Sequence, residues 1–183
     1  GKRVLVTGGA GAVGHYAIQF ARHGRASQIL ATVSGPEKAA AAKSAGADVV
    51  INYKTDDVVT RVMDATSGHG ADRIIDVDAT ANIGTDLQVL HGDGIIVVYG
   101  SGGEEIPVPF SPAILKNTRL RFFAVYTLTP DARARATSTL MELLDKGALV
   151  HNIAARLKLE QIAAAHELVE QGKVIGNVVL RIG

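Results

Sequence analysis

The chain has 183 residues and no cysteine, and its 19 basic and 18 acidic side chains give a formal net charge of +1. Hydrophobic residues make up 47%, which suffices for a packed core and excludes wholesale disorder. The near-neutral charge argues against a nucleic-acid-binding protein. Without cysteine there are no disulfides or thiolate metal sites, and no apolar run approaches the roughly 18 residues of a membrane span. We expect one domain or slightly more, in a reducing compartment such as the cytoplasm.

Short β-branched runs alternate with longer alanine-rich stretches along most of the chain, which is typical of βαβ units and a parallel sheet. In the first predicted helix, the spacing of Val13, Ala17, Phe20 and Ala21 indicates an apolar face. The segment 106–112 carries three prolines and is predicted to be a loop. The predicted strands are 3–7, 28–33, 48–51, 73–77, 95–99 and 120–126, and the helices are 12–23, 36–45, 56–66, 80–90 and 130–146.

The tail adds a predicted strand at 153–156, a helix at 160–171 and a strand at 178–182. The expected fold is therefore α/β: a Rossmann-type, doubly wound parallel sheet of about six strands, with a short C-terminal strand–helix–strand tail. We expect a domain over residues 1–150 and a tail over 151–183. In such a sheet, ligands bind outside the carboxyl ends of the strands, where the strand order reverses.

A glycine-rich loop follows the first predicted strand and precedes a helix. It has the pattern G-x-G-x-x-G, in which the glycines allow a tight turn, a close approach to a pyrophosphate and close helix–sheet packing. The helix N-terminus supplies free N–H groups for phosphates. This context favours a dinucleotide site over a merely tight turn. The loop residues are Gly9, Ala10, Gly11, Ala12, Val13 and Gly14.

The same loop also resembles the opening of extended short-chain dehydrogenases and sugar-nucleotide epimerases. Those enzymes need a Tyr-x-x-x-Lys pair, in which the lysine lowers the pKa of the tyrosine for proton transfer. The residues four positions after the tyrosines of this chain are Phe20, Asp57, Gly103 and Pro130. The epimerase interpretation therefore lacks its catalytic pair.

The segment after the second predicted strand indicates which nucleotide is bound. NAD-binding proteins usually place an acidic residue there for the ribose 2′-hydroxyl, whereas this strand ends in Thr32-Val33-Ser34. Lys38 follows on the next helix, where its ammonium group could reach a 2′-phosphate, and Tyr53 could flank the same pocket. We therefore predict NADPH rather than NADH. The alternatives are a solvated surface lysine and an ordinary aromatic at the rim.

Other polar residues give no strong signal for chemistry. None of the six histidines has zinc-binding spacing with a carboxylate partner, and Ser101 has no credible triad partners. We interpret Asp64, Asp72, Asp76 and Asp78 as solvated strand ends and turns. No catalytic residue and no metal ligand is assigned.

Six segments together resemble a known family, the medium-chain dehydrogenase/reductases, in their quinone oxidoreductase (zeta-crystallin-like) branch. The resemblance covers nearly the whole chain. It rests on residues 4–14, 31–38, 46–48, 51–53, 97–101 and 165–180.

The resemblance implies a Rossmann cofactor domain, with most of the substrate site on a separate GroES-like barrel, and the use of NADPH without zinc. It implies that the 10–14 loop faces the pyrophosphate, that Phe123, Ala124 and Val125 contact the carboxamide, and that Asn177 closes the site. Lys173 would add charge near the 2′-phosphate, beside Ser34, Lys38 and Tyr53. The residues implied along the ribose and nicotinamide are Asn82, Tyr99, Gly100, Ser101 and Gly102.

The implied activity is hydride transfer to a quinone or an α,β-unsaturated carbonyl, by a homodimer that pairs through the edge strand 120–126. Asp76 and Asp78 depart from the apolar residue and glycine that relatives often have. The barrel is absent, so we expect the chain to be part of a longer enzyme that binds NADPH but turns over little alone. Two alternatives remain: an enoyl-thioester reductase domain of a larger synthase, and a non-catalytic NADPH-binding or sensor module.

Overall fold

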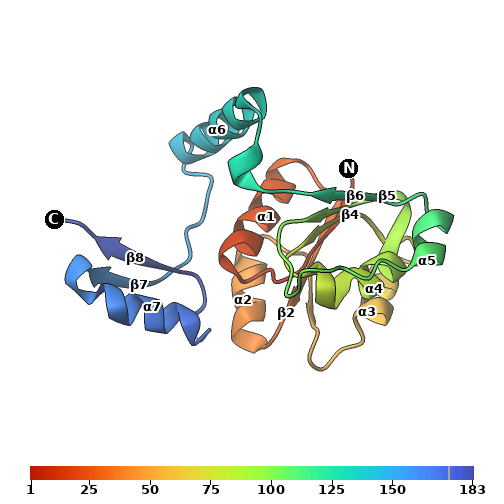
Figure 1. Ribbon diagram of the computed structural model, residues 1–183, viewed down its shortest axis with the longest axis horizontal. Helices are drawn as coiled ribbons and strands as arrows, with labels where there is room; N and C mark the ends of the chain where they lie inside the picture. The colour runs from red at the N-terminus through yellow and green to blue at the C-terminus, as the bar shows by residue number, and fades with distance from the viewer. Residues whose placement is uncertain (173) are drawn as a thin grey trace.

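The computed structural model, which describes residues 1–172 and 174–183, contains a six-stranded sheet and a separate two-stranded sheet (Figure 1). The large sheet has the order β3-β2-β1-β4-β5-β6, and all its strand pairs are parallel. The order reverses between β1 and β4, which confirms the predicted doubly wound Rossmann-type fold. Its strands are β1 (Arg3–Val6), β2 (Gln28–Val33), β3 (Val49–Asn52), β4 (Ala71–Asp76), β5 (Leu90–Val98) and β6 (Arg119–Phe122).

The helices connect the strands and cover both faces of the sheet. Asp57, Asp78 and Thr129 cap three of them by accepting hydrogen bonds from backbone N–H groups in the first turn. Among the described residues, no helix is both long enough and apolar enough to cross a membrane. The helices are α1 (Ala12–His23), α2 (Pro36–Ser44), α3 (Val58–Ala65), α4 (Ala79–Val89), α5 (Phe110–Leu115), α6 (Pro130–Asp145) and α7 (Ile162–Glu170).

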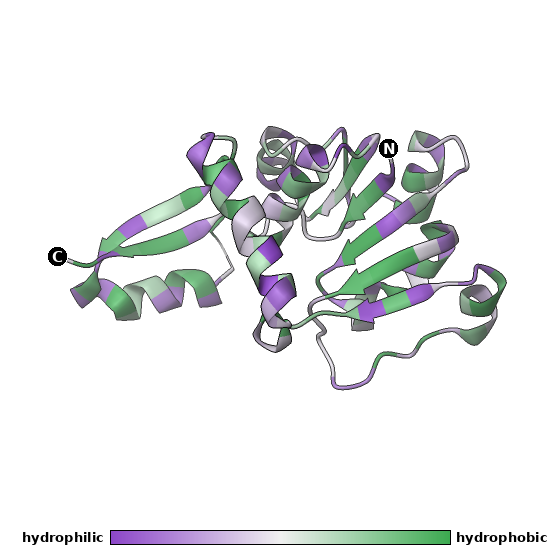
Figure 2. Ribbon diagram, turned by 90° about the horizontal axis from the view of Figure 1, so that it is seen from above, coloured by the Kyte–Doolittle hydropathy of each residue, from purple (hydrophilic) through white to green (hydrophobic). Residues whose placement is uncertain are grey.

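Alternate residues of the central strands enter two hydrophobic clusters. Leu5 and Ile74 belong to the cluster with α3 and α4, whereas Val4 and Val6 belong to the cluster with α1 and α2. Because both faces of these strands are covered, apolar residues fill most of β1 and β2 and positions 74 and 75 of β4, and green predominates along the strands in Figure 2.

The tail forms the second sheet, in which β7 (Ile153–Lys158) and β8 (Asn177–Arg181) run parallel and α7 makes the crossover. Its approach segment is held against α1. The side chain of Gln19 accepts from the Val150 N–H at 2.7 Å and donates to the Val150 carbonyl at 3.0 Å. The buried His15 and the Tyr16–His151 pair add two more hydrogen bonds to this segment.

Three local predictions were wrong in part. Val13 and Phe20 are 53% and 38% exposed, because α1 turns Gly14 and the fully buried Ile18 toward the sheet. The strand predicted over 120–126 ends at Phe122 and is followed by a 3-10 turn at Val125–Thr127. Its partner β5 ends at Val98, so the Phe123 N–H to Val98 carbonyl bond is the last rung. The end of the predicted loop forms the short helix α5.

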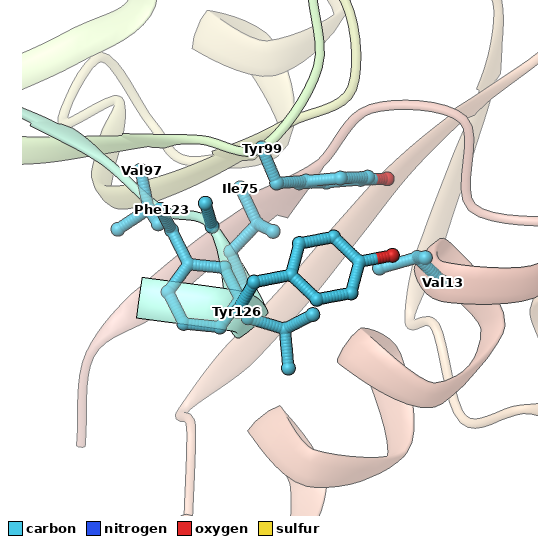
Figure 3. A pocket seen from close by; sticks show the side chains of 8 residues that line it. Val13, Ile75, Val97, Tyr99, Phe123 and Tyr126 are labelled. Atoms are coloured by element: carbon cyan, nitrogen blue, oxygen red, sulfur yellow. The ribbon is translucent and has the colours of Figure 1, made fainter. Parts of the chain in front are cut away.

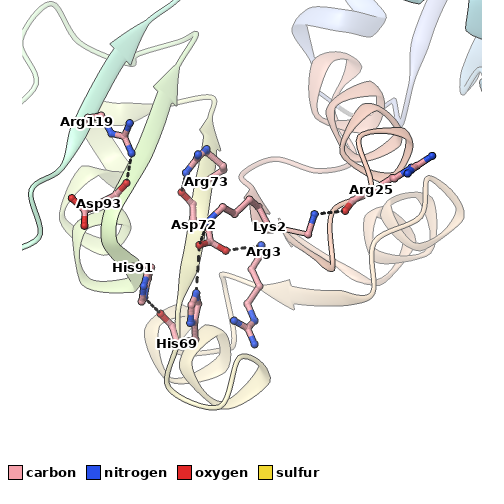
Figure 4. Close-up of polar contacts among 10 residues, drawn as sticks. Lys2, Arg3, Arg25, His69, Asp72, Arg73, His91, Asp93 and Arg119 are labelled. Carbon is pink, nitrogen blue, oxygen red and sulfur yellow. Dashed lines mark hydrogen bonds and ion pairs between the residues drawn. The ribbon is translucent and has the colours of Figure 1, made fainter.

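The interpretation of the aspartates as solvated was wrong for two of them. Asp72, at the amino end of β4, is 7% exposed and accepts from the Arg3 N–H at 2.8 Å, with Lys2 and His69 within ion-pair distance (Figure 4). Asp76, at the carboxyl end of the same strand, is fully buried. A buried carboxylate requires donors, so both residues organise their ends of the sheet.

Candidate dinucleotide-binding site

The glycine loop follows β1 at the point where the strand order reverses, and the close contacts of its backbone explain why it needs glycine. The Gly9 N–H donates to the Thr32 carbonyl at 2.9 Å. A Cβ on Gly14 would lie 2.3 Å from the Gly8 carbonyl oxygen, so only glycine lets α1 start this close to the turn. The N-cap residue of α1, Gly11, makes no side-chain cap, and the first turn carries no acidic residue. The N-terminal N–H groups of α1 therefore suit an anion.

A cavity of about 330 Å³, here called the loop cavity, joins this loop to the ends of β2 and β3. It brings together six of the predicted residues, Ala10, Gly11, Ala12, Ser34, Lys38 and Tyr53. The tail also contributes to it through Gly172, Val174 and Gly176, which the sequence did not indicate. Lys173 lies outside the described residues. The loop cavity thus places a helix N-terminus and a lysine around one space.

A second cavity of about 400 Å³, here called the inner cavity, shares Gly8, Tyr53 and Val77 with the loop cavity. Asn82 lines it and donates from its side-chain amide to Asp76 Oδ1 at 2.7 Å. The Thr7 hydroxyl donates to the same oxygen at 2.6 Å. Sequence reasoning missed the deepest polar residue of this cavity, Asp86 on α4. The sequence pattern that could have revealed Asp86 is an acidic residue on the same helix face as the buried Ile83 and Leu87.

The third cavity, here called the apolar cavity, has a volume of about 560 Å³ and lies at the carboxyl ends of β5 and β6. The predicted residues Val13, Tyr99, Phe123, Ala124 and Val125 line it. Figure 3 shows the rings of Tyr99 and Tyr126 extending toward Val13. Burial, with a smaller contribution from Asp76, raises the pKa of Tyr99 to about 12, so its hydroxyl is protonated at neutral pH. This cavity suits a flat, weakly polar ring.

The loop after β5 lies beside the inner cavity and is hydrogen-bonded to the start of α4. A Cβ on Gly100 would lie 2.1 Å from the Val77 carbonyl oxygen, so this position also requires glycine. The Gly102 N–H donates to Asp78 Oδ1 at 2.8 Å, and the hydroxyls of Ser101 and Thr80 are hydrogen-bonded. The unusual Asp78 therefore joins two loops and caps α4.

Asn177 is the one predicted residue within the described part of the chain that the structure places apart from these groups. Its backbone N–H donates to the Asn152 carbonyl at 2.8 Å, and its side-chain amide turns to the same oxygen. It does not line the three cavities. Within residues 1–172 and 174–183, no group of three or more His, Cys, Asp or Glu side chains could hold a metal ion.

Comparison with known proteins agrees with this geometry. The sequence pattern of the family described as "Zinc-binding dehydrogenase" matches residues 12–146. The quinone oxidoreductase of Lama guanicoe is 29% identical over 98% of this chain and 54% of its own length. The 2-haloacrylate reductase of a Burkholderia species is 28% identical over 98% of this chain and 55% of its own length.

Among solved structures, the Escherichia coli quinone oxidoreductase complexed with NADPH is 26% identical, with a TM-score of 0.86 over 99% of this chain and 57% of that chain. The chain thus spans about half the length of the relatives that it matches. It belongs to the zinc-binding dehydrogenase family, in the quinone oxidoreductase branch of the medium-chain dehydrogenase/reductase superfamily.

Proposed function

We propose that the chain is the NADPH-binding domain of an oxidoreductase that transfers a hydride to a quinone or an α,β-unsaturated carbonyl. The loop cavity carries this proposal, because it places the N-terminus of α1 and the Lys38 ammonium group around one space. The α1 N-terminus would bind the pyrophosphate, and Ser34 and Lys38 would bind the 2′-phosphate. A relative of this fold is complexed with NADPH, which supports the choice of nucleotide.

The proposed nucleotide would extend across the three cavities at the carboxyl ends of the strands. The 2′-phosphate and pyrophosphate would occupy the loop cavity, and the nicotinamide would lie in the apolar cavity against Phe123 and Val125. Tyr99 and Ala124 would complete this apolar wall, and Gly100, Ser101 and Gly102 would border the ribose. When bound, the dihydronicotinamide supplies the hydride, and the chain's own residues orient the ring and exclude water from one of its faces.

The proposed acceptor is supported by the relatives, whose names include a quinone oxidoreductase and a 2-haloacrylate reductase. A two-electron acceptor of this kind takes up the hydride from the dihydronicotinamide together with one proton. We propose that the enzyme works without zinc, as the resemblance to the quinone oxidoreductase branch implies, and the absence of cysteine from this chain is in keeping with that. An enoyl-thioester acceptor is the second candidate, since it is also an α,β-unsaturated carbonyl. Kinetics of the full-length protein with a quinone and with an enoyl thioester would separate the two.

We further propose that residues 1–150 form the cofactor domain and that residues 151–183 pack on a catalytic barrel in the whole enzyme. A cytoplasmic location is in keeping with the absence of cysteine. A homodimer is proposed through β6, which lies at the edge of the sheet and is followed by the half-exposed Phe123. Sedimentation tests this pairing: the wild type is expected to have the mass of a dimer and Phe122→Arg that of a monomer. The same mass for both proteins would contradict it.

Titration with NADPH and NADH tests the nucleotide assignment. The wild type is expected to prefer NADPH, and Lys38→Ala is expected to lose about 1 to 2 kcal/mol of NADPH binding with little change toward NADH. Lys43→Ala, at the other end of α2, is the matched control. The assignment fails if Lys38→Ala and the wild type bind both nucleotides alike. If the wild type binds neither nucleotide, the chain is a different kind of module.

A further inference from the structure

One half of the large sheet is fully covered on a single face. After their first residue, β1 and β2 are buried throughout, so both of their faces are covered. In β4 and β5 burial alternates: Ile74, Ile96 and Val98 are buried with α4, whereas Ile95 and Val97 are only partly buried. The side of β4, β5 and β6 that points away from α4 is here called the open face, and its strands are seen in Figure 2 without a described helix in front of them.

The open face is apolar at its centre and basic toward its edge. No acidic residue occupies it, and Ile75 alone still packs against the cluster of α1. A face that is left to water usually carries polar residues at its centre, so these branched apolar residues indicate that another element covers it. The register of the strands places six side chains on the open face, in the two rows Arg73, Ile95, Arg119 and Ile75, Val97, Arg121.

Helix α6 follows β6 in the chain but packs elsewhere. Leu143 is its one buried residue. Its side chains Leu140 and Leu144 share a groove of about 550 Å³ with Tyr16 and Phe20, so α6 leans on α1 and not on the strands. Pairing of two copies along the β6 edge would use the backbone of that strand and would also leave the open face uncovered.

We propose that the open face binds an amphipathic helix with an acidic flank, supplied by the polypeptide that precedes Gly1 in the full-length enzyme. This inference rests on the proposed function, in which the chain is one domain of a longer oxidoreductase. The quinone oxidoreductase of Lama guanicoe is matched over 54% of its length, which leaves enough polypeptide for such a helix. Helices cover the faces of parallel sheets, and an apolar stripe would meet Ile95 and Val97.

The charges of the open face and the position of the first residue favour this occupant. Arg119 and Arg121 are exposed at the edge, where they would attract acidic side chains. A second copy of the same face would instead bring arginines against arginines. The amino group of Gly1 donates to the Arg25 carbonyl at 2.7 Å, at the start of β1. Because β1 pairs with β4, a segment that leads into Gly1 lies about one strand spacing, roughly 5 Å, from the open face.

The absence of cysteine from residues 1–183 provides a site-specific test. Ile95→Cys places a single thiol on the open face, and its rate of reaction with a maleimide reports whether the face is covered. We expect rapid labelling of residues 1–183 and labelling about tenfold or more slower in the full-length protein, with the other cysteines of that protein replaced by serine. Val108→Cys, at a 42% exposed position in the loop before α5, is the matched control and should react alike in both.

A charge reversal in the full-length protein tests the acidic flank. Arg121→Glu is expected to speed the labelling of Ile95→Cys about threefold or more, because it repels that flank. Arg121→Lys and the control Lys43→Glu, an exposed position on α2, should leave the rate unchanged.

Three results would overturn the inference: equal labelling of Ile95→Cys in the two proteins, an unchanged rate in Arg121→Glu, or a rate that falls as the concentration of residues 1–183 rises. The last result would assign the open face to a second copy. If residues 1–183 do not fold alone, Arg121→Glu and Lys43→Glu in the full-length protein decide. Labelling requires no nucleotide, so absent NADPH binding overturns the proposed function without deciding this one.

Discussion

The two ends of the parallel sheet treat buried charge in opposite ways. At the amino end, Asp72 is met by the Arg3 N–H, the Lys2 ammonium group and His69, and Arg119 donates to the Asp93 carbonyl (Figure 4). At the carboxyl end, Asp76 and Asp86 each keep a buried oxygen that has no hydrogen-bond partner within residues 1–172 and 174–183, and Asp86 lines the inner cavity. The contrast indicates that the amino end is built for stability and that the carboxyl end is built to be completed by a ligand.

The same contrast appears in the ionisation of the two ends. The pKa of Asp72 lies below its usual value because the hydrogen bonds from Arg3, Lys2 and His69 together outweigh the effect of burial, which acts in the opposite direction. The pKa of Asp86 lies far above its usual value because burial and, to a smaller extent, the neighbouring Asp76 both disfavour its charged form. Two aspartates of one domain therefore respond to pH in opposite directions.

The largest expected effect on stability and on nucleotide binding comes from adding a methyl group to the glycine loop. In Gly14→Ala the new Cβ would lie 2.3 Å from the Gly8 carbonyl oxygen, so the loop or α1 must move. We expect a loss of about 4 kcal/mol in the free energy of unfolding, together with loss of NADPH binding. Urea unfolding and nucleotide titration measure the two effects.

Gly84→Ala is the matched control, because no atom lies within 4 Å of its new Cβ in the middle of α4. It is expected to stabilise the chain by about 0.5 to 1 kcal/mol. Equal effects of the two substitutions would contradict the steric explanation.

The second effect concerns pH. Asp86 keeps its proton in the folded state up to about pH 8, whereas the unfolded chain loses it near 3.8, so stability falls as pH rises between these values. The slope is about 1.4 kcal/mol per pH unit, and we expect Asp86→Asn to lose about 2 to 3 kcal/mol less than the wild type between roughly pH 5 and 7. Asp72 acts in the opposite sense: its contribution is present above the unfolded pKa of 3.8 and is lost as pH falls through the lower folded pKa. Thermal melts of the wild type and Asp86→Asn between pH 5 and 7 test the Asp86 assignment, and parallel profiles of the two would refute it. Melts of the wild type below pH 4 test the contribution of Asp72.

The smallest effect is expected at the rim of the amino end. Lys2 is 61% exposed at its side chain and shares Asp72 with the Arg3 N–H and His69. Lys2→Met should therefore cost about 1 kcal/mol or less, and added salt should reduce the difference. A larger loss in urea unfolding would mean that the amino end depends on this single ion pair.

The sequence alone predicted the architecture, because it depends on local signals. The alternation of β-branched and alanine-rich runs and the glycine loop each act within a few residues, and most helices and strands appear close to where these signals placed them. The loop residues 10–12 with Ser34, Lys38 and Tyr53 also come together as expected, since all of them follow parallel strands that end at one edge.

Tertiary structure decided what depends on partners distant in the sequence. The end of β6 depends on where β5 stops, and the exposed side of α1 depends on which helix face meets the sheet. The tail turn lines the loop cavity, and the start of the tail is held against α1 by the hydrogen bonds from Gln19 and His15 to Val150, more than 130 residues away in the sequence. Aspartate is usually an exposed residue type, and only the packing of its face of α4 makes Asp86 a buried acid. Local periodicity determines elements, whereas the charge and burial of a side chain are set by neighbours that folding brings together.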